Sequence, residues 1–259
     1  MSVLIYNSIM YNPFTLKDKI VLVTGASSGI GRSIAIECSR MGAKVILTAR
    51  NKERLEETLH QMENQQLHDI VLGDLSVEDD LSGIVNFVSE PLDGVVQCAG
   101  FTIPKPFQFL SEKDMEGVMK VNFMAPALLT RQLLKKKKFK KGSSIVFISS
   151  ISGVWVSSIG GSIYSASKGA VNGLVKGLAI ELSSKSIRVN TINPGMINTH
   201  IFDGGEISEE QLKEDMKHYP LRRYGEPEEV AYAAVYLLSD ASRWMTGSNI
   251  LIDGGYTLL

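Results

Sequence analysis

One stretch decides the fold of this chain: Lys19-Ile20-Val21-Leu22-Val23-Thr24-Gly25-Ala26-Ser27-Ser28-Gly29-Ile30-Gly31. Residues 19–24 are an apolar, β-branched run, which is typical of a buried parallel strand. Glycines follow at once, and residues 32–41 are expected to form a helix that ends before Gly42. A strand, a glycine turn and a helix in this order favour a dinucleotide site. The glycines let the backbone approach a pyrophosphate, and the helix N-terminus supplies N–H donors. The alternative is a loop that simply requires positive φ at Gly25 and Gly29.

Strand and helix patterns alternate along the rest of the chain. This order predicts a parallel sheet with right-handed crossovers. We therefore expect one α/β domain over residues 16–259, a Rossmann-type doubly wound sheet of about seven strands, after an N-terminal appendage of residues 1–15. The expected strands are 19–24, 44–48, 68–72, 94–100, 143–148, 186–192 and 248–252, and the expected helices are 32–41, 52–66, 76–90, 111–138, 164–182, 208–219 and 227–238.

Composition excludes several other classes of protein. Hydrophobic residues make up 44% of the 259 residues and charged residues 21%, as in soluble globular proteins. The formal charge of −1 offers no global attraction to nucleic acid or to an anionic membrane. Residues 1–14 lack a basic n-region and a continuous apolar core, so neither a signal peptide nor a spanning segment is expected. Cys38 and Cys98 form no framework or metal pattern, which favours reduced thiols in the cytoplasm.

The residues after the second expected strand bear on the choice of cofactor. Residues 44–48 are a short apolar run, and Ala49-Arg50-Asn51 ends it. In a doubly wound nucleotide fold the adenosine ribose lies here, and NAD-binding proteins tend to place a carboxylate at this point. Ala49 offers none, and the Arg50 guanidinium can pair with a 2′-phosphate. NADP(H) is therefore favoured over NAD(H), with an ordinary surface arginine as the alternative.

Tyr164 and Lys168 stand four residues apart in Tyr164-Ser165-Ala166-Ser167-Lys168, and share one face if this segment is helical. A cation held beside a phenol favours the phenolate, so the pair suits proton transfer. The alternative is a solvated helix face, since about half a pair of this spacing is expected by chance. Ser150 ends the fifth expected strand, where ligands bind in open α/β sheets. Asn122 lies within a long helical pattern, so it is either a solvated exception or a polar group at a local kink.

The ordered set of motifs resembles the short-chain dehydrogenase/reductase family from about Leu16 to Tyr256. The order and spacing of the motifs carry the resemblance more than any one of them. The motifs are the cofactor turn Thr24–Gly31, Asp74-Leu75 at the adenine contact, Gln97-Cys98-Ala99-Gly100 where Asn-Asn-Ala-Gly is usual, Asn122, Ser150 in Ser-Ser-x-Ser-Gly, Tyr164-x-x-x-Lys168, and Pro194-Gly195 with Ile197 and Thr199 at the nicotinamide carboxamide.

The resemblance implies a reaction and assigns roles. In carbonyl reduction a hydride leaves the nicotinamide while Tyr164 donates a proton to the nascent alkoxide. Lys168 favours the Tyr164 phenolate and hydrogen-bonds the nicotinamide ribose. Ser150 holds the carbonyl oxygen, and Asn122 holds a water that connects Lys168 to solvent. The implied cofactor-binding residues are Gly25, Ser27, Ser28, Gly29, Ile30, Gly31, Arg50, Asp74, Leu75, Ala99, Gly100, Tyr164, Lys168, Pro194, Gly195, Ile197 and Thr199.

No metal is expected. The reaction that the resemblance implies requires none. The histidines, which are the commonest metal ligands, all fall outside the quoted motifs. They are His60, His68, His200 and His218.

Among the subfamilies the chain most resembles the 3-oxoacyl-(acyl-carrier-protein) reductases of fatty acid biosynthesis. Residues 207–230 resemble their substrate lid and the helix that follows it, and Lys141 and Lys185 stand where those enzymes carry basic residues that meet the acidic carrier protein. The run Lys135–Lys138 enlarges this patch, although lysines at a helix C-terminus are normally just solvated. Sugar, polyol and secondary-alcohol dehydrogenases share every quoted motif, so an NAD(P)-dependent dehydrogenase is a second reading. A non-catalytic nucleotide-binding protein on the same fold is a third.

The resemblance also implies a cytoplasmic homotetramer that acts on a small-molecule or carrier-bound carbonyl compound, with no nucleic acid or membrane partner. Such an assembly would be built partly from the long helices around Asn122 and after Tyr164. Three small residues on the second of these helices would allow close approach across an interface, or could equally pack on the sheet of the same subunit. They are Gly169, Gly173 and Gly177.

Overall fold

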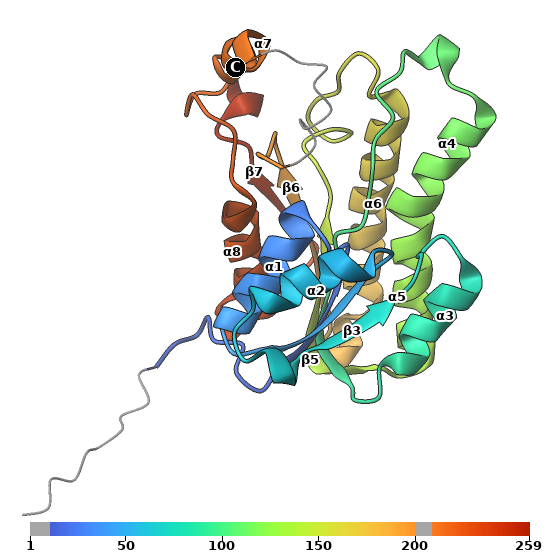
Figure 1. The fold of residues 1–259 in the computed structure, drawn as a ribbon, viewed down its shortest axis with the longest axis vertical. Helices are drawn as coiled ribbons and strands as arrows, with labels where there is room; N and C mark the ends of the chain where they lie inside the picture. Colours follow the sequence, from blue (N-terminus) through green and yellow to red (C-terminus); the bar gives the residue numbers. More distant parts are fainter. Residues whose placement is uncertain (1–10, 200–208) are drawn as a thin grey trace, which may run out of the picture.

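The computed structural model describes residues 11–199 and 209–259 of the chain. Within them one parallel sheet of seven strands has the order β3-β2-β1-β4-β5-β6-β7 (Figure 1). The order reverses between β1 and β4, which confirms the predicted doubly wound α/β fold. The strands are β1 Ile20–Thr24, β2 Lys44–Ala49, β3 Asp69–Leu72, β4 Leu92–Gln97, β5 Phe139–Ile148, β6 Arg188–Pro194 and β7 Asn249–Ile252.

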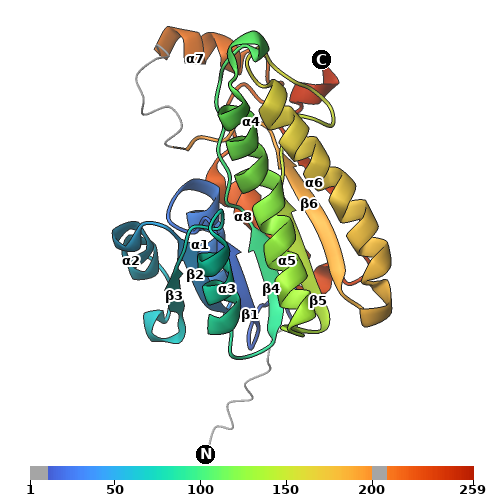
Figure 2. The ribbon, with the colours of Figure 1, turned by 90° about the vertical axis from the view of Figure 1, so that its right-hand side faces the viewer.

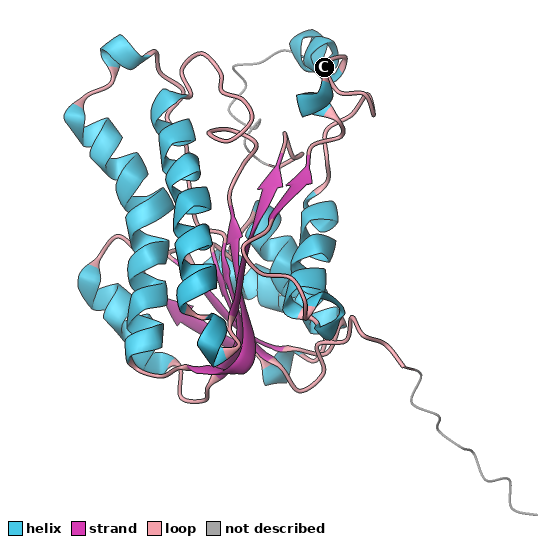
Figure 3. Cartoon of the chain, turned by 180° about the vertical axis from the view of Figure 1, so that it is seen from behind, coloured by secondary structure: helices cyan, strands magenta, loops and turns pink. Residues whose placement is uncertain are grey.

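Helices cover both faces of the sheet (Figure 2 and Figure 3). Successive strand residues point to opposite faces, so Val21 and Val23 pack in the same cluster as helices α1 and α8, whereas Leu22 packs with α3 and α5. A third cluster joins α6 to β5 and β6. The helices are α1 Gly29–Arg40, α2 Lys52–His60, α3 Glu78–Phe87, α4 Glu112–Met119, α5 Ala125–Lys135, α6 Ser162–Glu181, α7 Glu209–Met216 and α8 Pro227–Leu238.

The long helix expected over 111–138 is wrong in its length and continuity. It consists of α4, a π-helix at Lys120–Met124 and α5, which ends at Lys135. The next strand begins at Phe139 and not at residue 143, because Phe139 pairs with Leu92 of β4. A left-handed residue, Lys137 with φ +54°, separates the helix from the strand.

Other element bounds differ by smaller amounts. The helix expected over 52–66 ends at His60, and Asn64 with φ +52° turns the chain toward β3. The helix expected over 76–90 covers Glu78–Phe87, and β4 ends at Gln97. The helix expected over 208–219 covers Glu209–Met216, and residue 208 lies outside the described residues.

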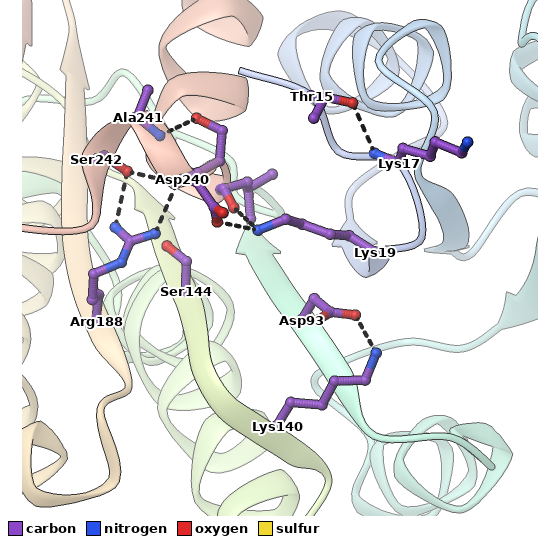
Figure 4. A network of polar contacts seen from close by, with 12 residues as sticks. Thr15, Lys17, Lys19, Asp93, Lys140, Ser144, Arg188, Asp240, Ala241 and Ser242 are labelled. Carbon is purple, nitrogen blue, oxygen red and sulfur yellow. Dashed lines mark hydrogen bonds and ion pairs between the residues drawn. The ribbon is translucent and has the colours of Figure 1, made fainter. Parts of the chain in front are cut away.

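The amino edge of the sheet is held by buried and partly buried polar contacts (Figure 4). Arg188 is only 9% exposed and donates to the carbonyl oxygens of Leu237 (2.7 Å) and Ser239 (3.4 Å), where α8 ends. Burial lowers the pKa of Arg188. Ser144 also donates to the Leu237 carbonyl, at 2.7 Å. These bonds satisfy carbonyl groups that a helix C-terminus leaves without partners.

The part of the expected appendage that is described contacts the domain. The Phe14 ring lies 6.2 Å from the Tyr236 ring of α8, and the Pro13 carbonyl accepts a hydrogen bond from the Ala241 N–H. Residues 1–10 lie outside the described residues. Of the helices that are described, none is long and apolar enough to cross a membrane.

Candidate active site

The glycine turn lies between the carboxyl end of β1 and the start of α1. Gly25 and Gly29 have φ values of +67° and +49°, which L side chains rarely adopt. A Cβ atom on Gly31 would lie 2.2 Å from the Gly25 carbonyl oxygen, and one on Gly25 would lie 3.0 Å from the Ala99 backbone. Ser28 makes no side-chain cap, so the first N–H groups of α1 are not satisfied by its hydroxyl. The backbone of this turn leaves no room for side chains at Gly25 and Gly31, and such an open cradle of backbone fits a pyrophosphate.

The end of β4 is tied directly to the glycine turn. The Thr24 hydroxyl oxygen accepts hydrogen bonds from the N–H groups of Cys98 (3.0 Å) and Ala99 (3.2 Å). The bonds place Ala99 beside Gly25. A Cβ atom on Gly100 would instead lie 3.2 Å from Asn122 Oδ1 and 3.6 Å from Lys168 Nζ. Thr24 is the first residue of the predicted cofactor turn, but it was not among the predicted cofactor-binding residues. The sequence did offer a signal for this role, because Thr24 carries a hydroxyl at the end of a buried strand. A buried hydroxyl needs a hydrogen-bond partner, and here the backbone at the end of a neighbouring strand can provide it.

Arg50 and Asp74 lie together where β2 and β3 end. Their side chains are 3.7 Å apart, and Arg50 is largely exposed. Burial would raise the pKa of Asp74, but hydrogen bonds from Ser76 and the charge of Arg50 together hold it below its ordinary value. The carboxylate is therefore ionised at neutral pH. Leu75, the other residue predicted at the adenine contact, is 9% exposed and packs in the core.

Lys168 is held at the carboxyl edge of β5. Its side chain comes from α6, is 5% exposed and donates from Nζ to the carbonyl oxygen of Ile148 at 2.9 Å. The same nitrogen lies 5.7 Å from the centroid of the Tyr164 ring. Tyr164 is half-buried, and its hydroxyl makes no hydrogen bond within the described part of the chain. The phenol is thus left for a ligand, with a buried cation beside it.

Ser150 lies two residues beyond Ile148 on the same chain segment. Its side chain is 9% exposed, and its Oγ accepts a hydrogen bond from the Ser152 N–H at 3.1 Å. That bond leaves the hydroxyl proton free to be donated. Ser150 therefore lies at the same edge of the sheet as the Lys168 ammonium, which bonds to Ile148 two residues before it.

Asn122 occupies the middle of the π-helix and is 2% exposed. Its amide exchanges two hydrogen bonds of 2.9 Å with the N–H and the carbonyl of Phe101, and also donates to the Ser167 hydroxyl at 3.1 Å. A π-helix widens the helical turn and often marks a functional site. Asn122 was predicted to be either a solvated exception within a helix or a polar group at a local kink. Because Asn122 is buried at an irregular turn of the helix, the structure supports the second alternative.

The predicted nicotinamide loop follows β6. The Gly195 N–H donates to the Ile252 carbonyl at 2.8 Å, and Ile197 bridges to Gly225. The Thr199 side chain would lie 3.2 Å from a Cβ atom on Gly29. The loop from Pro194 to Thr199 therefore returns to the glycine turn, and the two predicted cofactor segments meet.

The unusual pair Gln97-Cys98 is accommodated by packing. Gln97 is 3% exposed and donates to the Thr130 hydroxyl at 3.3 Å, but its Oε1 finds no partner among the described residues. Burial raises the pKa of Cys98 to about 12, against the influence of the Lys168 charge. Cys98 is therefore a neutral thiol at physiological pH. No cluster of metal-ligating side chains occurs in the described residues, and His200 lies outside them.

A glycine cradle at the switch point of a doubly wound sheet, with a tyrosine and a buried lysine beyond it, defines a dinucleotide-dependent oxidoreductase. The family model described as enoyl-(acyl carrier protein) reductase matches residues 25–257. The chain belongs to the short-chain dehydrogenase/reductase family, whose members bind NAD(P)(H) and act on alcohol and carbonyl groups.

Curated relatives of differing activity match nearly the whole chain. Glucose 1-dehydrogenase of Gluconobacter oxydans is 38% identical and covers 95% of this chain and 96% of its own. The NADP-dependent (R)-specific alcohol dehydrogenase of Lentilactobacillus kefiri is 34% identical, and the match covers 93% of this chain and 98% of the relative. The 3-oxoacyl-(acyl-carrier-protein) reductase of Rickettsia prowazekii is 32% identical, and the match covers 94% of this chain and 99% of the relative.

Solved structures match as well. A 7α-hydroxysteroid dehydrogenase complexed with NADH and 7-oxo glycochenodeoxycholic acid has a TM-score of 0.86 and 31% identity, over 95% of this chain and 98% of its own. A dehydrogenase/reductase from Sinorhizobium meliloti has a TM-score of 0.85 and 29% identity, and the match covers 94% of this chain and 97% of that structure's chain.

Proposed function

We propose that this protein is an NADPH-dependent carbonyl reductase whose substrates are 3-oxoacyl compounds, with Asn122, Ser150, Tyr164 and Lys168 as its catalytic residues. One observation carries the proposal. The Tyr164 phenol has no protein hydrogen-bond partner among the described residues, and lies beside a buried ammonium at the carboxyl edge of the sheet. The nicotinamide cofactor, when bound, supplies the hydride.

The residues of the chain manage the proton and the carbonyl oxygen. Ser150 donates its free hydroxyl proton to that oxygen and stabilises the charge that develops on it. Tyr164 then donates its proton to the alkoxide, and Lys168 stabilises the phenolate that is left. Lys168 is nearly inaccessible, so it needs a relay to solvent. The proposal assigns the water of that relay to Asn122, whose amide protons are donated to Phe101 and Ser167, so an oxygen of Asn122 would accept from the water.

The proposal is tested by the oxidation of NADPH in the presence of a panel of carbonyl compounds. The panel contains 3-oxoacyl thioesters, acetoacetyl-carrier protein, simple ketones and a ketose. Turnover of the thioesters supports the proposal. Turnover confined to sugars supports the second candidate, an NAD(P)-dependent sugar, polyol or secondary-alcohol dehydrogenase, which the identity to glucose 1-dehydrogenase favours. A chain that binds NADPH and turns over nothing would be the third candidate, a non-catalytic nucleotide-binding protein.

Arg50 is proposed to select NADPH through the 2′-phosphate. Its guanidinium is exposed and its only described partner is Asp74 at 3.7 Å, so it can turn toward a phosphate at small cost. We expect Arg50→Ala to raise KM for NADPH about tenfold and to leave KM for NADH unchanged, because one charge-assisted contact is lost. Steady-state kinetics with both cofactors measure this. Arg54→Ala, on the next turn of the chain, is the matched control. A wild-type preference for NADH would contradict the proposal.

Exposed apolar side chains on two loops support an acyl substrate over a sugar. Residues 149–161 contain no charged side chain, and residues 101–110 contain only Lys105, which pairs with Asp114 at 3.0 Å. The loops touch, since the Lys105 N–H donates to the Gly160 carbonyl at 3.2 Å. They flank Ser150 and Asn122 and expose Phe107, Trp155 and Ile159 to the extent of 66%, 40% and 97%. An acyl chain would cover these three apolar side chains, which a sugar would leave in contact with water.

We expect Ile159→Asp to raise KM for a long-chain 3-oxoacyl thioester about tenfold, because the contact that buries this side chain is lost. KM for the acetoacetyl thioester, which lacks the chain, should change little. Trp244→Asp is the control, because Trp244 is fully exposed and follows η6, Asp240–Ser242, near the opposite edge of the sheet. Equal effects on the long and short thioesters would contradict an apolar substrate contact at these loops.

The lysine run is partly structural. Lys140 pairs with Asp93 at 2.6 Å, and Lys138 donates to the Val88 carbonyl at the end of α3. Lys141 and Lys185 are exposed, and both lie toward the amino edge of the sheet, away from Ser150. The position of these two lysines therefore does not support a carrier protein that docks beside Ser150 of the same chain. The homotetramer stays a prediction, which light scattering can test. Gly173 and Gly177 are exposed and have open space beside them, so α6 does not use them against its own sheet.

A further inference from the structure

A cluster of buried polar side chains lies behind the catalytic lysine. Ser149 follows β5, Asn172 is on α6 and Thr191 is on β6, and they are 4%, 5% and 0% exposed. Polar groups at such depth are costly unless they are hydrogen-bonded, so their contacts report what the cluster holds in place.

The contacts converge on the main-chain carbonyl of Lys168. The Ser149 hydroxyl donates to this carbonyl at 3.1 Å, and the Asn172 amide donates to it at 2.9 Å. The same amide nitrogen donates its second proton to the Ser149 Oγ at 2.8 Å. Ser149 and Asn172 thus form a closed triangle with the backbone of Lys168.

β6 anchors this triangle from the other side. The Thr191 hydroxyl lies 3.1 Å from Asn172 Oδ1 and 3.0 Å from Asn249 Oδ1, so its one proton serves these two oxygens. The Ser149 N–H also donates to the Ile192 carbonyl at 2.8 Å. The turn of α6 that carries Lys168 is therefore tied to the sheet and cannot slide along it without breaking several bonds.

Two consecutive residues at the end of β5 consequently hold the two ends of Lys168. The Ile148 carbonyl accepts a hydrogen bond from the ammonium, and the Ser149 hydroxyl donates to the main-chain carbonyl. The next residue, Ser150, is the one proposed to hold the substrate oxygen. We propose that Ser149 and Asn172 are positioning residues, which set the distance from the Lys168 ammonium to Tyr164 and to the cofactor ribose. This inference rests on the proposed function, and it assigns a role to two residues outside the catalytic set.

A second serine on β5 provides a matched control. Ser144 is 1% exposed, and its hydroxyl donates to the Leu237 carbonyl at 2.7 Å, near the amino edge of the sheet (Figure 4). Ser144→Ala and Ser149→Ala each delete one buried hydroxyl that donates to a main-chain carbonyl. They differ in whether that carbonyl belongs to the catalytic lysine.

The test compares Ser149→Ala, Asn172→Ala and Ser144→Ala in the full-length protein by urea unfolding, NADPH titration and the pH profile of kcat in the direction of alcohol oxidation. All three variants should lose stability. Only Ser149→Ala and Asn172→Ala should lower kcat, by about tenfold or more, because a displaced lysine misplaces the reacting groups. They should also bind NADPH several-fold more weakly. The pH of half-maximal oxidation should rise, because a more distant cation favours the phenolate less.

The inference is overturned if Ser149→Ala behaves as Ser144→Ala does, with lower stability but wild-type kcat, pH profile and NADPH affinity. If Asn172→Ala does not fold, the pair of serine variants decides alone. Absence of turnover in the wild-type protein would count against the proposed function. The NADPH titration would still decide the positioning role, because Lys168 is proposed to contact the cofactor whether or not a substrate reacts.

Discussion

Replacement of Tyr164 by phenylalanine is expected to lower kcat for ketone reduction about a thousandfold, within the range that a positioned proton donor contributes. The change removes one hydroxyl from a half-buried ring that keeps its packing against Lys168, 5.7 Å away. That hydroxyl makes no hydrogen bond within the described residues, so the stability of the protein should hardly change. Steady-state kinetics at saturating NADPH and urea unfolding measure the two effects.

Tyr232→Phe is the control for Tyr164→Phe, because Tyr232 is an exposed tyrosine of α8, which lies on the other face of the sheet. It should keep the wild-type kcat. A Tyr164→Phe variant with undiminished turnover would show that the proton comes from elsewhere. If turnover is absent in the wild-type protein as well as in Tyr164→Phe while NADPH still binds, the chain is a nucleotide-binding protein without this activity.

Replacement of Lys168 by methionine is expected to lower kcat about a hundredfold or more and to weaken the binding of NADPH as well. Methionine has nearly the length of lysine and suits a site that is 5% exposed, so the packing is retained while the charge is lost. Without the ammonium, the Tyr164 phenolate loses its stabilising cation, and the proposed bond to the ribose disappears. Turnover and an NADPH titration separate these two losses.

Lys176→Met is the control on the same helix. Lys176 is exposed and donates to the Gly247 carbonyl at 2.7 Å, two turns of α6 beyond Lys168. Its loss should leave kcat and the affinity for NADPH unchanged. Lys168→Arg tests whether charge alone suffices, and we expect little recovery, because a planar guanidinium does not fit a site shaped for one Nζ–H donor to the Ile148 carbonyl. Full activity of Lys168→Met would refute the role of this lysine, whereas full activity of Lys168→Arg would show that a positive charge alone suffices.

The fold could be predicted because each local pattern agreed with its neighbours. The run from Lys19 to Thr24 has no polar face, so it suits a strand covered by helices on both sides, and β1 is an interior strand of the sheet, between β2 and β4. Helix α8 begins at Pro227 and ends at Leu238, as expected from a proline at its first turn and an apolar face.

Element bounds were predicted less well where long-range pairing overrode the local pattern. Residues 136–142 continue a lysine-rich run that by itself suits a helix end. In the structure Phe139 pairs with Leu92, nearly fifty residues earlier, and Lys138 and Lys140 bond to the Val88 carbonyl and to Asp93. The π-helix at Asn122 likewise depends on Phe101, whose backbone bonds to the asparagine amide. No periodicity of the helix itself reveals such a partner.

The sequence by itself determined the kind of protein and the identity of its candidate chemical groups. A glycine turn after a buried strand, an asparagine, a serine at a strand end and a tyrosine four residues before a lysine are local features, and their order along the chain identifies the family. Only the tertiary structure decided which groups touch. It placed the Lys168 ammonium on the Ile148 carbonyl, left the Tyr164 hydroxyl without a partner among the described residues, and enclosed Ser149 and Asn172 around the lysine backbone. The reason is that these contacts join β5 to α6 across a sheet edge, and their geometry depends on the packing of both elements, which no single segment encodes.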